Sequence, residues 1–252
     1  MKVILLGAGM LGKQLYKTFV NHPTVDLIQW YNRSETDTIS PEGIALTNVL
    51  DDLEKADLLL LAVSDDALSG IAKKIHTNAL VLHTAGSVSI DALHPHKRRG
   101  VWYPIQSFSN QKNIDFSVLT FGVETNNPSD KQLVLNLTKS IEAKAIDLNS
   151  DQREKLHFAA VMVNNFTNHL FTQAALFCEE NNLSFNLLRP LIQETVDKID
   201  ILSPQDAQTG PALRNDQSTL KRHLELIKNP TLKAVYTTLT AAIQKHHGSE
   251  KL

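Results

Sequence analysis

The run Val3-Ile4-Leu5-Leu6-Gly7-Ala8-Gly9-Met10-Leu11-Gly12 decides the fold of this chain. It places an apolar strand directly before a G-x-G-x-x-G loop that opens a helix. In such a loop Gly7 permits the tight turn, Gly9 leaves room for a pyrophosphate, and Gly12 lets the helix lie close to the strand. The free N–H groups at the helix start would meet the pyrophosphate charge. We therefore expect a dinucleotide to bind at Gly7, Ala8, Gly9, Met10, Leu11 and Gly12; a glycine-rich turn without a ligand is the alternative.

Apolar runs typical of strands alternate with helical patterns through residues 1–148. Several runs are apolar at consecutive positions, which suits parallel strands covered on both faces. The alternation predicts right-handed crossovers and a doubly wound, mainly parallel sheet in an α/β domain. The predicted strands are Val3–Leu6, Val25–Tyr31, Leu58–Val63, Leu80–His83, Gly100–Tyr103, Leu119–Glu124 and Ala143–Leu148. The predicted helices are Met10–Val20, Asp66–Ile75 and Ser129–Glu142.

The pattern changes near Asn149, and no convincing strand follows. One long helix is predicted over Asp151–Asn181, with Asn149 or Ser150 as its N-cap. Leu202–Asp216 contains two prolines and a glycine and is predicted to be an ordered loop. Further helices are predicted over Phe185–Ile201, Gln217–Lys228 and Thr231–His246. Residues 149–252 are therefore expected to form a second, all-helical domain.

Composition narrows the classes of function. The chain has 252 residues, 42% of them apolar, and a formal net charge of -2, so it lacks the basic excess that would attract nucleic acid or anionic lipid. Its longest apolar run, Leu58–Val63, is far shorter than the roughly 20 residues that span a bilayer. The single cysteine, Cys178, rules out an intramolecular disulfide. We expect a cytoplasmic protein with no nucleic-acid or membrane partner and no metal.

Asn32-Arg33-Ser34 stands where the identity of the dinucleotide is usually read, about 20 residues after the glycine loop. An acidic residue at this place would bind the ribose 2′-hydroxyl of NAD. Arg33 can instead pair with a 2′-phosphate, and Asn32 and Ser34 can donate to it. The segment predicts NADP(H); a solvated turn with an incidental arginine is the alternative.

The carboxyl ends of the later strands should line the nicotinamide half of the site. Backbone at Val63 and Ser64 is expected to support the cofactor. His83, Thr84 and Ser87 could reach the nicotinamide ribose or the substrate. His83 has an alternative explanation, a strand-end histidine whose ring is held by a backbone hydrogen bond. Asp65 and Asp66 also have an alternative explanation, as the N-cap and a first-turn acid of the next helix.

The long helix and the loop after it carry further candidates. At about 100° per residue, His157 and Asn164 share one face of a helix, with Ala160 and Val161 beside them. This face could point into a substrate pocket between the domains, or its polar groups could be satisfied within the helical core. Arg214, in Thr209-Gly210-Pro211-Ala212-Leu213-Arg214-Asn215-Asp216, could clamp a carboxylate. It could equally pair with Asp216, whose simpler role is the N-cap of the following helix.

The motifs together resemble a family. The glycine loop, Asn32-Arg33-Ser34, Ala62-Val63-Ser64-Asp65-Asp66 and the helical tail resemble the superfamily of pyrroline-5-carboxylate reductase and 6-phosphogluconate dehydrogenase. A narrower resemblance is to the Rossmann-like NADP oxidoreductases with a helical C-terminal domain of unknown function, DUF2520. It is carried by His83-Thr84-Ala85-Gly86-Ser87, Tyr103-Pro104-Ile105-Gln106-Ser107-Phe108, His157-Phe158-Ala159-Ala160, Asn164-Asn165 and Thr209-Gly210-Pro211 with Arg214 and Asp216.

The resemblance implies a Rossmann domain that binds NADP(H), and a homodimer built through the helical tails. It implies an enzyme that moves hydride to or from a small carbonyl, imine or hydroxy compound at the cleft between the domains. His157 or His83 would then supply or take the proton, with Asn164 and Arg214 in the same site. A reductase of imines like pyrroline-5-carboxylate reductase and a non-catalytic redox-sensing module are the alternatives. The chain departs from the hydroxyacid dehydrogenases of the superfamily, because Lys155 is followed four places later by Ala159 and not by an asparagine.

Overall fold

The computed structural model describes residues 1–34, 37–109 and 114–248, and the chain divides into two compact units, Met1–Phe166 and Thr167–Leu252. The first unit contains the sheet and the first part of the long helical stretch. The sequence-based domain boundary after residue 148 stays a prediction, because compactness alone does not define a folding domain.

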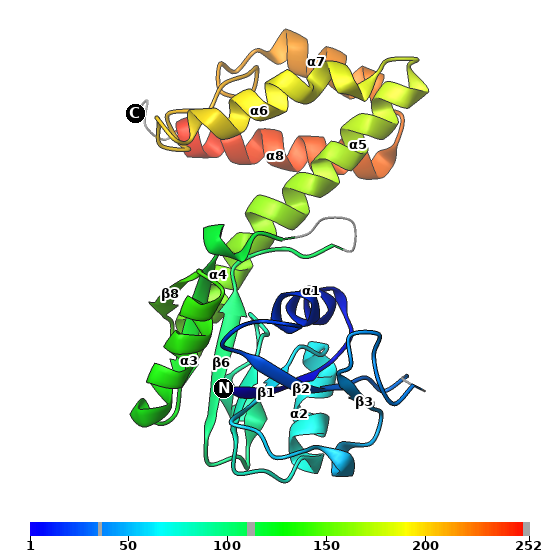
Figure 1. The fold of residues 1–252 in the computed structure, drawn as a ribbon. Coiled ribbons are helices and arrows are strands. Elements are labelled where there is room, and N and C mark those ends of the chain that lie inside the picture. Colours follow the sequence, from blue (N-terminus) through cyan, green and yellow to red (C-terminus); the bar gives the residue numbers. More distant parts are fainter. Residues whose placement is uncertain (35–36, 110–113, 249–252) are drawn as a thin grey trace. The chain divides into compact units, whose positions relative to one another are not determined.

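One sheet of eight strands organises the first unit, in the order β3-β2-β1-β4-β5-β6-β7-β8 (Figure 1). Its strands are β1 (Lys2–Leu6), β2 (Asp26–Tyr31), β3 (Ala45–Thr47), β4 (Leu58–Leu61), β5 (Leu80–His83), β6 (Arg99–Pro104), β7 (Thr120–Thr125) and β8 (Lys144–Asp147). Strands β1 to β6 are parallel to one another, β7 is antiparallel to β6, and β8 is parallel to β7. The predicted mainly parallel, doubly wound α/β fold is confirmed, and the short edge strand β3 was missed.

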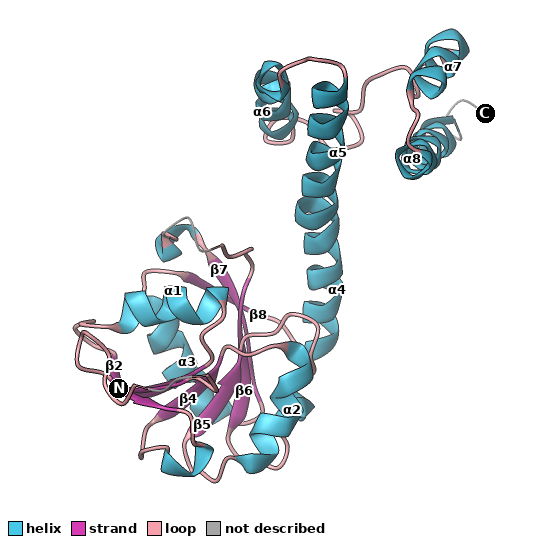
Figure 2. Ribbon diagram, turned by 90° about the vertical axis from the view of Figure 1, so that its right-hand side faces the viewer, coloured by secondary structure: helices cyan, strands magenta, loops and turns pink. Residues whose placement is uncertain are grey.

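Helices cover both faces of this sheet, which explains the continuous apolar runs. Helices α1 (Met10–Phe19) and α3 (Pro128–Ser140) contribute to one core, and α2 (Asp65–Lys74) contributes to the other (Figure 2). Along β1, Val3 and Leu5 enter the first core while Ile4 and Leu6 enter the second. Four consecutive positions of β1, Val3 to Leu6, are buried, so apolar and polar residues do not alternate along them.

The chain leaves β1 toward β2 on one side and reaches β4 on the other, so the strand order reverses between β1 and β4. A doubly wound sheet binds its ligand in the crevice at such a point, outside the carboxyl ends of the strands. Gly7 follows β1 and Ala62 follows β4 at this edge. The topology therefore places the glycine loop where a dinucleotide is expected.

Helical structure continues without a break from Ser150 to Glu180 in three segments. They are α4 (Ser150–Ala160), the π-helix η4 (Val161–Phe166) and α5 (Thr167–Glu180). Asn149 caps α4, because its side chain accepts from the Gln152 backbone N–H while the Gln152 side chain accepts from the Asn149 backbone N–H. Of the two predicted N-caps, Asn149 is therefore the one used.

In the second unit, all regular secondary structure among the described residues, 167–248, is helical, and residues 199–216 form a non-helical connection. After α5 the helices are the 3-10 turn η5 (Phe185–Leu188), α6 (Arg189–Lys198), α7 (Gln217–Leu226) and α8 (Pro230–Gly248). Buried apolar side chains are few in this unit: Cys178, Ala212 and Leu220. No helix among the described residues combines the length and apolarity needed to cross a bilayer.

Candidate functional site

The glycine loop is held by close backbone contacts to its neighbours. Gly7 has a φ of 110°, a region that favours glycine, and its N–H donates to the Tyr31 carbonyl at 2.9 Å. The Trp30 indole N–H donates to the Gly7 carbonyl, also at 2.9 Å. A Cβ on Gly7 would collide with the Ala62 carbonyl oxygen, and a Cβ on Gly12 would collide with the Gly7 carbonyl. These two glycines therefore let β1, β4 and α1 meet.

Gly9 has a different environment. It is the exposed N-cap of α1, and a Cβ built on it would have no heavy atom within 4 Å. No side chain caps the helix at this end, so the backbone N–H groups of its first turn have no side-chain partner among the described residues. A pyrophosphate fits this arrangement, because it needs both the room over Gly9 and unpaired helix N–H groups.

Asn32, Arg33 and Ser34 follow β2 directly, beside the glycine loop. The Asn32 N–H donates to the Thr47 carbonyl at 3.0 Å, and the Asn32 side-chain oxygen accepts from the Ser34 N–H at 3.5 Å. Arg33 is exposed and forms no ion pair with any other residue that the structure describes. Its guanidinium could therefore pair with an anion such as a 2′-phosphate.

The end of β4 lies next to the glycine loop, and the end of β5 lies one strand further along the sheet. Val63 is half-buried and would be in contact with a Cβ on Gly7, and Ser64 is the exposed N-cap of α2. The Thr84 hydroxyl is buried and donates to the Leu61 carbonyl at 3.4 Å. The Ser87 hydroxyl donates to the Asp65 carboxylate at 2.6 Å, so both side chains already have a partner.

His83 has no exposed surface, and its Nδ1 accepts from the Ala85 N–H at 3.2 Å. Burial, together with the positive charge of Arg153, lowers the pKa of His83 to about 4, against the weaker opposite effects of the Ser89 backbone and Asp65. The ring is therefore neutral at pH 7 and sealed from solvent. This backbone hydrogen bond is the one expected if His83 is a strand-end histidine whose ring is held by the backbone.

His157 lies against the ends of β5 and β6. Its Nδ1 atom is 3.3 Å from the Tyr103 hydroxyl oxygen, and the two rings meet edge to face with centroids 6.0 Å apart. A Cβ on Gly86 would lie only 2.5 Å from His157 Nδ1 and 2.9 Å from Tyr103 Cε2. The missing side chain of Gly86 thus makes the room in which the two rings meet. His157 is half-buried, and no described residue forms a hydrogen bond with its Nε2 atom.

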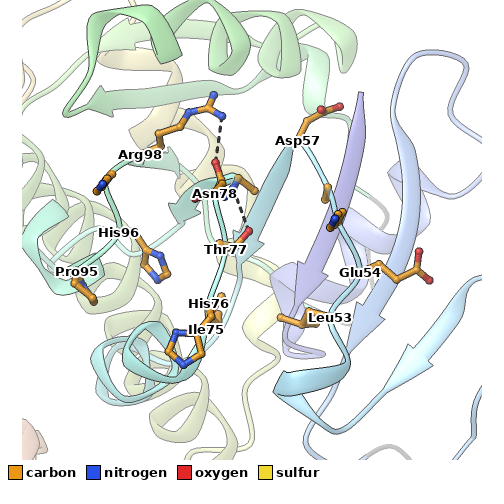
Figure 3. A pocket seen from close by; sticks show the side chains of 14 residues that line it. Leu53, Glu54, Asp57, Ile75, His76, Thr77, Asn78, Pro95, His96 and Arg98 are labelled. Carbon is orange, nitrogen blue, oxygen red and sulfur yellow. Dashed lines mark hydrogen bonds between the residues drawn. The ribbon is translucent and has the colours of Figure 1, made fainter.

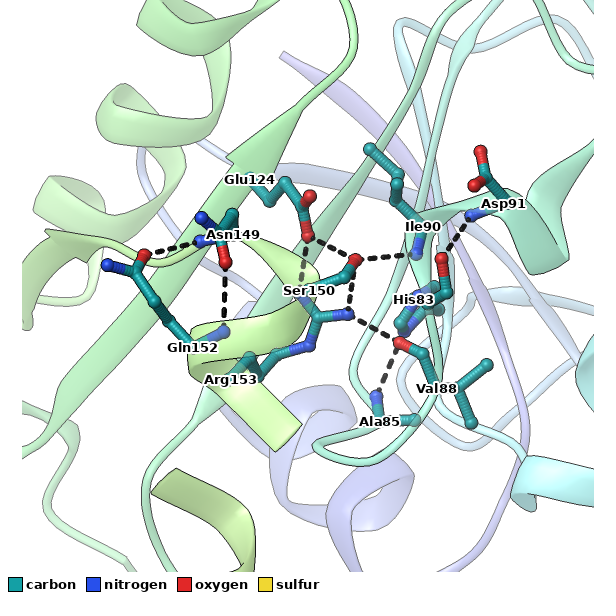
Figure 4. Close-up of polar contacts among 11 residues, drawn as sticks. His83, Ala85, Val88, Ile90, Asp91, Glu124, Asn149, Ser150, Gln152 and Arg153 are labelled. Carbon is teal, nitrogen blue, oxygen red and sulfur yellow. Dashed lines mark hydrogen bonds and ion pairs between the residues drawn. The ribbon is translucent and has the colours of Figure 1, made fainter. Parts of the chain in front are cut away.

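Arg153, one turn before His157, anchors α4 to the sheet (Figure 4). Its side chain is 1% exposed and donates to the Glu124 carboxylate, the Val88 carbonyl and the Ser150 hydroxyl. Ser150 in turn donates to Glu124 at 2.8 Å and accepts from the Ile90 N–H at 3.1 Å. This network joins α4 to β7 and to the loop after β5, and so fixes the position of His157 on α4.

Asn164 and Arg214 are not brought to this place by any described contact. Asn164 is exposed within η4, and since η4 is a π-helix, the α-helical spacing that predicted a face shared with His157 does not hold there. Arg214 is exposed in the second unit and forms no described ion pair with Asp216, which caps α7 through the Thr219 N–H. A role for Asn164 or Arg214 in the site stays a prediction.

Sequence reasoning placed Tyr103 and Gly86 at strand ends that line the nicotinamide half but gave neither an individual role, and it did not single out Arg153. Tyr103 was visible as a polar-tipped residue at a strand end, and Arg153 lies four residues before His157 on the same helix. Nothing in the sequence indicated that the two elements would meet over Gly86.

A cavity of about 1030 Å³ lies elsewhere, at the opposite edge of the sheet (Figure 3). It is lined by loops that precede β4, β5 and β6, including Asp57, Thr77 and Arg98. Arg98 is engaged by Asp130 at 2.6 Å and by the Asn78 carbonyl at 3.4 Å. Ligands of doubly wound sheets bind at the other edge, so this cavity is not the candidate site. Within the described part of the chain, no three His, Cys, Asp or Glu side chains gather as a metal site requires.

Comparison with known proteins gives one family match. Residues 119–243 match the model of a domain of unknown function, DUF2520. A Bacteroides fragilis protein provisionally named an NADP oxidoreductase is 32% identical, over 97% of this chain and 98% of that chain, with a TM-score of 0.84. No curated protein sequence matches the chain.

Two more distant structures are similar in fold. An imine reductase of Myxococcus stipitatus in complex with NADP+ has a TM-score of 0.72 at 14% identity, over 99% of this chain and 95% of that chain. A pyrroline carboxylate reductase of Plasmodium falciparum with NADP bound has a TM-score of 0.62, also at 14% identity, over 99% and 97%. At such identities the likeness shows the fold alone.

Proposed function

The chain belongs to the DUF2520 family, and on that premise we propose that it is an NADP(H)-dependent oxidoreductase of a small carbonyl, imine or hydroxy compound. The observation that carries the proposal is the open space over Gly9 at the start of α1, which no described side chain caps. The Bacteroides fragilis relative, 32% identical over nearly the whole chain, supports the same activity.

The fit of NADP(H) follows from this chain's own residues. Backbone of Gly7, Ala8, Gly9, Met10, Leu11 and Gly12 would receive the pyrophosphate, and Val63, Ser64 and Thr84 would lie toward the nicotinamide half. Asn32, Arg33 and Ser34 would receive the 2′-phosphate, because Arg33 is exposed and forms no ion pair with another described residue. When bound, the nicotinamide supplies or accepts hydride.

His157 is the best-placed residue to move a proton. It is half-buried on α4, beside the end of β6. One ring nitrogen lies against the Tyr103 hydroxyl, and no described residue forms a hydrogen bond with the other. His83 is a weaker candidate, because its ring is sealed and its pKa is lowered to about 4 by burial. Proton donation from a positioned side chain typically contributes about 10²–10⁴-fold to a rate.

Cofactor titrations test the proposal. We expect Gly9→Val to place its side chain in the pyrophosphate space, so that NADPH binding measured by calorimetry is nearly abolished while the fold is kept, because no heavy atom lies within 4 Å of that Cβ. Gly70→Val is the matched control, since a Cβ on Gly70 of α2 also meets open space. Unchanged NADPH affinity in a folded Gly9→Val protein would contradict the proposal.

The same titrations test the choice of dinucleotide. Loss of one charge-assisted contact in Arg33→Ala should weaken NADPH binding by about one to two orders of magnitude and leave NADH binding nearly unchanged. Equal affinity of the unmodified chain for NADPH and NADH would contradict the assignment. A screen of small carbonyls, imines and hydroxyacids that follows NADPH absorbance then separates an enzyme from a redox-sensing module, which would bind and not turn over.

The helical second unit supports a homodimer. Large apolar side chains are exposed along its helices, among them Leu187, Leu191 and Val196, while few are buried. A unit with so little core of its own is stabilised when a second copy covers its apolar faces. A mass of twice 28.0 kDa in sedimentation equilibrium is expected, and a monomer at micromolar concentration would contradict this part of the proposal.

A further inference from the structure

The Tyr103 hydroxyl has one hydrogen-bond partner among the described residues, the Nδ1 atom of His157 at 3.3 Å. Tyr103 is 7% exposed, and its burial raises the pKa of the hydroxyl, although the nearby charge of Arg153 acts in the opposite direction. The hydroxyl is therefore protonated at neutral pH. A buried phenol needs an acceptor for this proton, and His157 Nδ1 is the one present.

A neutral imidazole carries a single proton, on one of its two nitrogens. The nitrogen that accepts a hydrogen bond is the bare one, so the proton is on the other. If Nδ1 of His157 carried it, the proton of the partly buried Tyr103 hydroxyl would have no acceptor among the described residues. Donation from Tyr103 to Nδ1 satisfies both groups and leaves the ring proton on Nε2.

The position of the His157 ring decides how its tautomer affects ligand binding. The ring is half-buried, Gly86 and Tyr103 occupy its Nδ1 side, and no described residue forms a hydrogen bond with Nε2. Nε2 is thus the atom left to meet a ligand at the strand ends. Which hydrogen-bonding partner the ligand must offer depends on whether Nε2 carries the proton.

We propose that Tyr103 is a positioning residue that holds neutral His157 as the Nε2–H tautomer, so that His157 presents a hydrogen-bond donor to the substrate. This rests on the proposed function and narrows its substrate class. An Nε2–H donor selects a ligand atom with a free lone pair, such as a carbonyl oxygen. It disfavours a protonated imine, because the imine N–H and the Nε2–H of His157 would be two donors facing each other.

Nuclear magnetic resonance of the ¹⁵N-labelled full chain at neutral pH tests the tautomer without any ligand. The cross-peaks between ring nitrogens and carbon-bound protons distinguish Nε2–H from Nδ1–H, and His157→Gln identifies the His157 signals. We expect the Nε2–H pattern for His157 in the unmodified chain. In Tyr103→Phe we expect the ratio of Nε2–H to Nδ1–H to fall by about three- to tenfold, the weight of one hydrogen bond.

The chain offers a matched control. Tyr236 also bonds a histidine Nδ1, that of His223 at 2.9 Å, with the rings again edge to face at 5.8 Å. Tyr236→Phe should change the His223 signals and leave the His157 ratio as it is. An Nδ1–H pattern for His157 in the unmodified chain, or an unchanged His157 ratio in folded Tyr103→Phe, overturns the proposal.

Failure of this proposal and failure of the proposed function give different results. NADPH titration of the same samples reports on the glycine loop, and we expect Tyr103→Phe to bind NADPH as the unmodified chain does. A chain that shows the Nε2–H pattern and binds no NADPH contradicts the proposed function. A chain that binds NADPH and shows the Nδ1–H pattern contradicts only the role of Tyr103.

Discussion

Adding one methyl group at Gly86 tests the contact on which the candidate site depends. The new Cβ of Gly86→Ala would lie 2.5 Å from His157 Nδ1 and 2.9 Å from Tyr103 Cε2. An ordinary contact begins at 3.4 Å, so the histidine ring must move by about 0.9 Å. Tyr103 is buried in the sheet and His157 is half-buried on α4, which Arg153 anchors, so neither ring has much freedom to relax. The φ of Gly86 lies outside the left-handed region, so backbone strain does not contribute.

We expect two consequences of this displacement. Overpacking of a well-filled site typically lowers the free energy of unfolding by about 1–3 kcal/mol. The hydrogen bond between Tyr103 and His157, 3.3 Å long, should be lost or rearranged, so the His157 ring signals should shift. A misplacement of about 1 Å can reduce turnover about 100-fold once a substrate is known. NADPH affinity should change little, because none of the heavy atoms nearest to the new Cβ belongs to the glycine loop.

Urea denaturation and histidine resonances provide the measurement, and Gly70→Ala is the control. Gly70 lies inside α2 with no heavy atom within 4 Å of a built Cβ. Exchange of glycine for alanine there should raise the free energy of unfolding by about 0.5–1 kcal/mol. If Gly86→Ala behaves like Gly70→Ala and leaves the His157 signals in place, the rings do not meet over Gly86 and the reasoning is refuted.

Two further predictions concern the groups that support the site. Because burial lowers the pKa of His83 to about 4 in the folded chain, this histidine contributes stability that is complete above about pH 6.5 and is lost as the pH falls toward 4. That loss of unfolding free energy is about 3 kcal/mol between these limits. In urea denaturation, the unfolding free energy of His83→Gln should therefore fall less steeply with decreasing pH than that of the unmodified chain. Equal pH dependence of the two proteins would contradict this prediction. Arg153→Met leaves the Glu124 carboxylate without its buried partner and should lower the free energy of unfolding by about 3–5 kcal/mol. Lys155→Met, which removes an exposed pair with Asp151, should change it by less than about 1 kcal/mol, and equal effects of the two variants would show that Arg153 does not anchor α4.

The sheet could be predicted from the sequence where a strand is buried on both faces. Leu58–Leu61 is such a strand, and its run of leucines has few alternative interpretations. The edge strand Ala45–Thr47 was missed because three half-buried residues have no detectable period. The antiparallel direction of β7 was not predicted either, since the side chains of a buried strand alternate between the same two faces whichever way it runs.

The helices show where periodicity reaches its limit. The long helix after Asn149 was predicted almost to its ends, because its cap and polar residues follow general rules. The shared face of His157 and Asn164 was derived from α-helical spacing, and the structure changes that spacing at Val161. Val161–Phe166 has no sequence feature that separates a π-helix from an α-helix. The two helices differ in the spacing of their backbone hydrogen bonds, and the same side chains fit both.

The pair of Tyr103 and His157 lay beyond sequence reasoning for a physical reason. The two residues are 54 positions apart, and each by itself is explained as a polar tip at the end of an apolar element. Their contact requires Arg153 to hold α4 against β7 and Gly86 to have no side chain. Neither condition is a motif, because a buried arginine and a loop glycine have many other uses. A charged side chain four residues before a helical histidine, together with a glycine after a buried strand, becomes informative only when the distances among them are known. The glycine loop is different, since its three glycines are close in sequence and their spacing alone encodes the geometry that a pyrophosphate needs.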